Sequence, residues 1–149
     1  MRTRQALLSG AAGALSLNLI HETARHTLPH APQVQALGMR ALAKTFRAAG
    51  ERPPHRDRLY WLTLAGDLLA NGLYYSLVAA DEPRRIWRRG LLLGTAAGMG
   101  AVFLPQPMGL GRQPGAKAPL TQLLTVLWYL SGGLVAAAVA TRLARMPTR

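Results

Sequence analysis

The feature that most constrains this sequence is the separation of its charges from long uncharged segments. No Asp, Glu, Lys or Arg occurs between Leu91 and Gly111 or between Ala118 and Thr141. About 20 helical residues cross the roughly 30 Å hydrocarbon core of a bilayer, so uncharged apolar runs of this length are typical of membrane spans. The two segments predict membrane helices over about residues 84–104 and 119–142.

Two further segments of mixed polarity are predicted to complete a bundle of four transmembrane helices. The first covers about residues 5–27 and ends before Pro29 and Pro32, because proline lacks the backbone donor that a helix needs. The second covers about residues 57–80, with Asp57 as a helix cap and aromatic residues near both ends. The predicted fold class is therefore an all-α, polytopic membrane bundle that forms a single domain over residues 1–149.

The segment at about residues 33–49 has a different pattern. Val34, Leu37 and Phe46 recur at helical spacing, whereas Arg40, Lys44 and Arg47 fall on another face. A basic amphipathic helix between two membrane spans is typical of a helix that lies in the membrane interface, and we favour that interpretation. The alternative is a soluble helix packed on the rest of the protein.

The charge balance indicates a lipid partner rather than nucleic acid. The net charge is +12, and basic residues flank the apolar segments, which suits anchoring at anionic lipid headgroups. The sequence contains no nucleic-acid-binding motif, so no nucleic-acid partner is expected. The absence of cysteine excludes disulfides and thiolate metal sites. Arg2 and Arg4 precede an apolar run without a suitable cleavage site after it, so an uncleaved first helix is favoured over a signal peptide.

A polar stripe on the predicted second span carries the candidate functional residues. Ionisable groups inside a span are costly and therefore mark candidate sites. Asp67 lies in the middle of this span, with Thr63 and Asn71 one turn away on either side. The first span has a matching stripe at Asn18, Glu22 and His26. If the two helices are antiparallel neighbours, Asn18 is level with Asp67, and the two stripes form one intramembrane polar site.

Three interpretations of this stripe stay open. The favoured one is structural: hydrogen bonds of Asp67 would hold the helices in register. The second is a proton or cation pathway that uses Asp67, and the third is a lipid-binding or lipid-acting site near Glu22 and His26. Metal-binding and catalytic motifs are absent, so no catalytic residue, metal or cofactor is expected.

Glycines on the predicted third span form a ridge of small residues. Gly90, Gly94 and Gly98 are four residues apart, a spacing that lets a neighbouring helix approach closely in lipid. We expect this ridge to serve helix packing or self-association.

The outline resembles that of many small four-span proteins of bacterial inner membranes, although no motif identifies a family. The predicted function is a non-enzymatic accessory or scaffold subunit, or a homo-oligomer, with a membrane-protein partner or a second copy. Its basic residues divide evenly between the two sides of the predicted bundle. The dense cluster between Arg84 and Arg89, together with Arg2 and Arg4, favours both termini in the cytoplasm.

Overall fold

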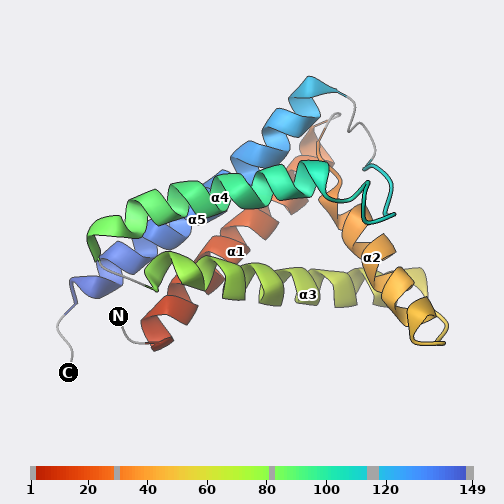
Figure 1. Ribbon diagram of the computed structural model, residues 1–149, viewed down its shortest axis with the longest axis horizontal. Helices are drawn as coiled ribbons and strands as arrows, with labels where there is room; N and C mark the ends of the chain where they lie inside the picture. The colour runs from red at the N-terminus through yellow and green to blue at the C-terminus, as the bar shows by residue number, and fades with distance from the viewer. Residues whose placement is uncertain (1–2, 29–30, 81–82, 114–117, 147–149) are drawn as a thin grey trace.

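The computed structural model describes residues 3–28, 31–80, 83–113 and 118–146, and these form helices and short connections (Figure 1). The all-α prediction is confirmed. The α-helices and the two 3-10 turns, η1 and η2, are α1 (Thr3–Thr27), α2 (Val34–Ala48), α3 (Arg56–Ser76), η1 (Leu77–Ala79), η2 (Pro83–Arg85), α4 (Ile86–Phe103) and α5 (Pro119–Ala144).

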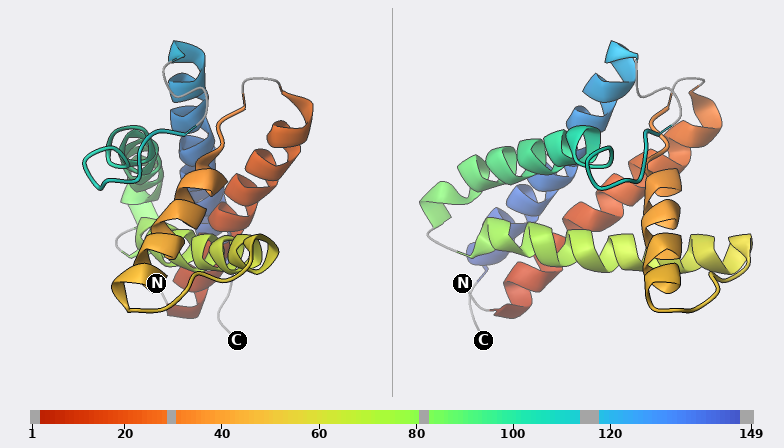
Figure 2. Two further views of the ribbon diagram at one scale, coloured as in Figure 1. Left: turned by 90° about the vertical axis from the view of Figure 1, so that its right-hand side faces the viewer. Right: turned by 45° about the vertical axis from the view of Figure 1, so that its right-hand side comes forward.

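The bundle is built around α5, which packs against both α4 and α1. On its other side α1 packs against α3, which it crosses obliquely (Figure 1). The shorter α2 lies across the first half of α3 (Figure 2). The start of α1 meets the end of α5, where Gln5 Nε2 donates a hydrogen bond of 3.1 Å to the carbonyl of Leu143.

Glycine allows a close helix contact between α4 and α5. Gly90, Gly94 and Gly98 are all buried. A methyl group on Gly90 would lie 2.7 Å from the carbonyl oxygen of Gly133, and one on Gly98 would lie 2.6 Å from the Cα of Val126. The glycine ridge therefore faces α5 inside the protein, and this surface is already occupied.

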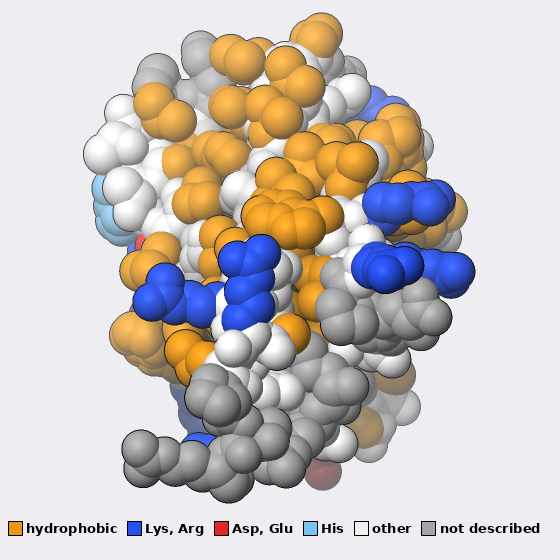
Figure 3. All heavy atoms as spheres, turned by 90° about the vertical axis from the view of Figure 1, so that its left-hand side faces the viewer, with side chains coloured by type: hydrophobic (Ala, Val, Ile, Leu, Met, Phe, Trp, Pro, Cys, Tyr) orange, Lys and Arg blue, Asp and Glu red, His pale blue; other side chains and the backbone are white. Residues whose placement is uncertain are grey.

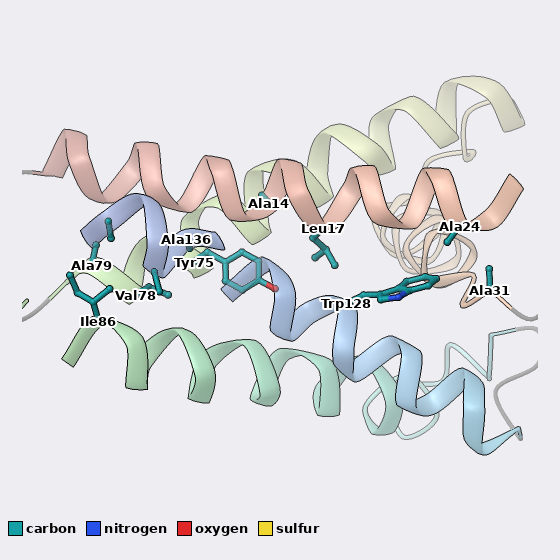
Figure 4. Close-up of a cluster of buried hydrophobic side chains, with 12 residues drawn as sticks. Ala14, Leu17, Ala24, Ala31, Tyr75, Val78, Ala79, Ile86, Trp128 and Ala136 are labelled. Atoms are coloured by element: carbon teal, nitrogen blue, oxygen red, sulfur yellow. The ribbon is translucent and has the colours of Figure 1, made fainter. Parts of the chain in front are cut away.

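Small side chains and two large aromatic groups, Tyr75 and Trp128, fill the core (Figure 4). Tyr75 is fully buried, and its hydroxyl donates a hydrogen bond of 2.7 Å to the carbonyl of Tyr129. Val78, Ile86 and Ala136 lie close to it, and Leu17 and Trp128 extend the core toward the other end of the bundle. Glycines leave room for the Tyr75 ring, because a methyl group on Gly13 of α1 would lie 3.2 Å from its Cδ2 atom and one on Gly132 of α5 would lie 2.9 Å from its hydroxyl.

The prediction of four transmembrane helices, and with it a multi-pass protein, is wrong. Among helices of the described residues, only α5 is long and apolar enough to cross a membrane. α4 has only 18 residues and carries Arg88 and Arg89 near its start. α3 carries Asp67 in its middle and further charged residues in its first turn. α1 has the length but also carries Glu22 and Arg25. In α5, 44% of the most apolar 18-residue stretch is buried inside the protein. The buried core helix of a soluble protein can be equally long and apolar.

The prediction that residues 33–49 form a helix lying in the membrane interface is also wrong. α2 packs on α3, where a methyl group on Gly38 would lie 2.6 Å from Thr63 Cγ2. Arg40 Nη1 donates hydrogen bonds to the carbonyls of Leu110 and Arg112, and Lys44 Nζ donates one of 2.7 Å to the carbonyl of Met108. Two basic residues of α2 are thus held by the loop after α4 instead of by headgroups.

Candidate functional site

The two predicted polar stripes lie on helices that contact each other and run in opposite directions (Figure 1). Close to the start of α1, Gly10 lies against the backbone of Gly72 and Ser76. Close to its end, Glu22 Oε1 accepts a hydrogen bond of 2.6 Å from the hydroxyl of Tyr60 on α3. Helix pairing therefore brings side chains 38 residues apart in the sequence into direct contact.

Glu22 is the centre of a small ionic network. Arg25 Nε donates a hydrogen bond of 2.7 Å to Glu22 Oε2, and Arg25 Nη2 donates one of 3.2 Å to the Tyr60 hydroxyl. The Arg25 guanidinium also lies 5.3 Å from the centre of the Tyr60 ring, a distance typical of a cation–π contact. His26 Nε2 is 4.0 Å from Glu22 Oε2. The network fixes Glu22 and Tyr60 in one arrangement.

Opposing effects set the protonation of this pair. Burial favours the neutral carboxyl, but hydrogen bonds from Tyr60 and Arg25, with the charges of Arg25 and His26, outweigh it and lower the pKa of Glu22. Burial, and then the hydrogen bond and charge of Glu22, raise the pKa of Tyr60. At neutral pH, therefore, Glu22 is an anion and Tyr60 a neutral donor.

This network forms one wall of a pocket of about 480 Å³ between the end of α1, the start of α2 and the start of α3. Ligand pockets in proteins typically have volumes of about 300–1,000 Å³. Its lining combines two cations, Arg25 and Arg56, with two anions, Glu22 and Asp57. The remaining polar lining consists of amide, imidazole and phenol groups from Asn18, His21, His26, Gln33, Gln35 and Tyr60.

His21 joins this pocket to the core. Its ring lies 5.2 Å from that of Trp128 and 5.7 Å from that of Tyr129, both on α5. Burial lowers the pKa of His21 to about 4, against the opposing charge of Glu22, so the imidazole is neutral at pH 7. Its Nε2 atom is buried and has no hydrogen-bond partner among the described residues. His21 was missed as a site residue, although it continues the buried face of Ala14, Leu17 and Ala24 at helical spacing.

Asp67 lies apart from the pocket lining. Its carboxylate faces α2, where both oxygens are 3.8 Å from the position of a methyl group on Gly38. Burial raises the pKa of Asp67 to about 6. No hydrogen bond to this carboxylate occurs among the described residues.

The other predicted site residues divide between these two places. Asn18, Glu22 and His26 line the pocket. Thr63 is buried on the α2 side of α3, and Asn71 is partly buried one turn beyond Asp67. Asn18 Nδ2 donates to the carbonyl of Ala14, and Thr63 Oγ1 donates to that of Leu59, so each bonds to its own helix.

An apolar groove of about 420 Å³ runs along the opposite flank of the same α1 segment, lined by Leu19, Ile20, Thr23, Ala24, Thr27, Leu28 and Trp128. Within the described part of the chain, no three His, Asp or Glu side chains are grouped closely enough to hold a metal ion. No protein-family model, curated protein or solved structure matches this chain. The geometry of the pocket is therefore the basis for a functional proposal.

Proposed function

We propose that this chain is a membrane-associated binding protein that holds a small polar ligand without net charge between α1, α2 and α3. The observation that carries this proposal is the balanced lining of the pocket, to which Arg25 and Arg56 contribute two cations and Glu22 and Asp57 two anions. The chain as a whole carries a net charge of +12, so the equal numbers of cations and anions in the pocket lining differ from the strongly basic composition of the chain.

The charge balance selects the class of ligand. A simple anion would meet the carboxylates of Glu22 and Asp57, and a simple cation would meet the guanidinium groups of Arg25 and Arg56. A zwitterion or a hydroxyl-rich molecule pairs with both kinds of group. The side-chain amides of Asn18, Gln33 and Gln35 supply further donors and acceptors for such a ligand.

A zwitterion could reach the pocket as a free molecule or as a lipid headgroup. The apolar groove along the other flank of α1 supports the lipid source, because it offers about 420 Å³ beside the same helix segment. A lipid bound near Glu22 and His26 would use both the polar pocket and the apolar groove.

Membrane association is supported by the outer surface of the bundle. Leu69 and Leu73 on α3 are 66% and 53% exposed, and Leu92 on α4 is 61% exposed. Large exposed apolar surfaces mark contacts with membranes or other proteins.

An accessory or scaffold role, in a homo-oligomer or beside a membrane-protein partner, would use the same surface. Attachment to a bacterial inner membrane with cytoplasmic termini belongs to this proposal, and the arginines near the ends of the chain support that orientation.

Proton- or ion-linked transport through Asp67 has less support. Burial raises the pKa of Asp67 to about 6, which suits a titrating group. Asp67 does not line the polar pocket, however, so the pocket gives a transported ion no route to its carboxylate.

Calorimetric titration with three related probes tests the proposed ligand class. Glycerophosphoethanolamine is a zwitterion, whereas glycerol 3-phosphate and ethanolamine carry its anionic and cationic parts separately. We expect the zwitterion to bind the detergent-solubilised chain at least about tenfold more tightly than either part, which corresponds to about 1.4 kcal/mol. Equal affinities, or no binding of any probe, would contradict the proposal. Phosphatidylethanolamine in mixed micelles distinguishes the sources, because a lipid site binds it more tightly than the free headgroup.

A further inference from the structure

Basic side chains lie on two sides of exposed apolar side chains at the end of the bundle where α4 begins and α5 ends (Figure 3). The two helix ends lie together, because a methyl group on Gly90 would be 2.8 Å from Ala137 Cβ. We call this surface the terminal face. It consists of Leu77, Trp87, Leu92 and Met146 with Arg84, Arg85, Arg88, Arg89, Arg142 and Arg145.

The apolar side chains of the terminal face are about half exposed. Trp87 is 51% exposed, Leu77 is 50% exposed and Met146 is 49% exposed. A groove of about 330 Å³ runs between Leu77, Ala80, Leu92 and Leu93, with Arg89 at its edge. Arg89 Nη1 lies 3.4 Å from the carbonyl oxygen of Leu77, a contact that holds this cation beside the groove.

The charge of the terminal face is strongly positive. The chain has 6 acidic residues, of which Glu22, Glu51, Asp57 and Asp67 lie in other parts of the sequence. Asp81 and Glu82 precede the arginines of α4 and lie outside the described residues. Even with both acids counted, the six arginines leave this end of the protein with a clear excess of positive charge.

Apolar and cationic groups side by side fit a lipid surface better than a nucleic acid. Arginine binds phosphate in either partner, but a nucleic-acid backbone offers no apolar phase for Trp87 and Leu77. A bilayer interface offers both, since tryptophan is enriched at headgroup depth and basic residues bind anionic lipids.

We propose that the terminal face docks on a bilayer surface rich in anionic lipid, with Trp87 at headgroup depth and the arginines on lipid phosphates. This inference rests on the membrane association proposed above but is independent of the ligand pocket. It also specifies which end of the bundle approaches the anionic leaflet.

Sedimentation with vesicles tests the charge of the partner. Vesicles of phosphatidylcholine alone are compared with vesicles that also contain phosphatidylglycerol. The double variant Arg84→Gln/Arg88→Gln removes two exposed cations of the terminal face, and the control Arg47→Gln/Arg52→Gln removes two exposed cations elsewhere. Each interfacial arginine contributes a factor of about five, so the first variant should bind anionic vesicles roughly 25-fold more weakly. The control variant should change binding by less than about threefold.

A probe at Trp87 tests the geometry. The chain has no cysteine, so Trp87→Cys and Trp61→Cys each accept a single nitroxide label. We expect the label at position 87 to lose accessibility to a water-soluble relaxation agent on anionic vesicles, and to lose more than the label at position 61. A chain that binds neither vesicle contradicts membrane association as a whole. A chain that binds vesicles while position 87 stays in water, or that binds a DNA duplex more tightly than anionic vesicles in the same buffer, contradicts only the docking of the terminal face.

Discussion

The hydroxyl of Tyr60 on α3 donates a hydrogen bond of 2.6 Å to the carboxylate of Glu22 on α1, and this contact joins two walls of the polar pocket. Because Arg25 binds both partners, the three side chains act as one unit. The position of this unit determines which charges face a ligand, and most of the expected effects of mutation follow from it.

Replacement of Tyr60 by Phe removes the donor and keeps the ring. We expect a loss of about 1–2 kcal/mol in the free energy of unfolding, because hydrogen bonds to a charged group contribute about 1.5–3 kcal/mol and water weakens this partly exposed one. Glycerophosphoethanolamine should bind at least about fivefold more weakly, because Glu22 is no longer held in place. Tyr74→Phe is the matched control, since Tyr74 donates a hydrogen bond of 3.0 Å to the carbonyl of Leu93, away from the pocket. If both variants affect binding equally, the contact with Glu22 has no special role.

Acid should weaken the Glu22 network. The pKa of Glu22 is lower in the folded protein than its ordinary value of 4.5. The network therefore stabilises the fold fully above pH 4.5 and loses this contribution as the pH falls through the lower, folded value. Denaturation of the wild type and Glu22→Gln at a series of pH values measures this effect. We expect the difference between them to shrink below pH 4.5, and a difference independent of pH would count against the network.

Asp67 should have the opposite pH dependence. Its pKa rises from 3.8 to about 6 on folding, so the folded state disfavours the ionised form. The destabilisation is absent below pH 3.8, grows as the pH rises through about 6 and is complete above it. Asp67→Asn should therefore stabilise the protein at pH 7 by an amount on the order of 2–3 kcal/mol, and should have little effect at pH 3.5. Thermal unfolding at the two pH values distinguishes this outcome from a uniform shift.

His21 should make the fold sensitive to mild acid. Its pKa falls from 6.5 to about 4 on folding, so stability is complete above pH 6.5 and decreases as the pH falls toward 4. His21→Phe keeps an aromatic ring against Trp128 and removes the titrating group. As the pH falls from 6.5 to 4.5, the unfolding midpoint of the wild type should decrease relative to that of the variant, because Asp67 contributes equally to the pH dependence of both. Parallel curves would show that the pKa of His21 does not change on folding.

The contact between α4 and α5 can be tested with a pair of glycines. A methyl group on Gly94 would lie 2.8 Å from the Cα of Leu130, whereas one on Gly66 would meet no atom within 4 Å. Gly94→Ala should destabilise the protein by about 1–3 kcal/mol through overpacking. Gly66→Ala should stabilise α3 by about 0.5–1 kcal/mol, because alanine is the better helix former. Chemical denaturation of both variants measures these values, and equal effects would contradict the close contact.

The helices could be predicted from the sequence because local signals mark their ends. Pro29 follows the end of α1 closely, and Pro119 begins α5, as expected from the geometry of proline. The number of membrane spans could not be predicted in the same way. The uncharged segment from Leu91 to Gly111 extends well beyond the helix, because α4 ends at Phe103 and Pro105 follows. The length of this uncharged segment therefore overestimates the length of the apolar helix within it.

The candidate site was only partly predictable for a related reason. Glu22 and His26 stand one turn apart on one helix, so their proximity follows from local sequence. Tyr60, Arg56 and Gln35 come to the pocket from other segments, and their positions depend on how α2 and α3 cross α1. The same crossing turns Asp67 toward Gly38. Sequence spacing alone does not determine such angles.

The central claim is that the pocket between α1, α2 and α3 binds a zwitterion. The most direct measurement is a titration of the ¹⁵N-labelled chain in detergent with glycerophosphoethanolamine, monitored by NMR at the side-chain amides. The account predicts saturable shifts for Asn18, Gln33 and Gln35, which line the pocket, and none for Gln5, which binds the carbonyl of Leu143 at the opposite end. Shifts that spare the three pocket amides, or that never saturate, would contradict it.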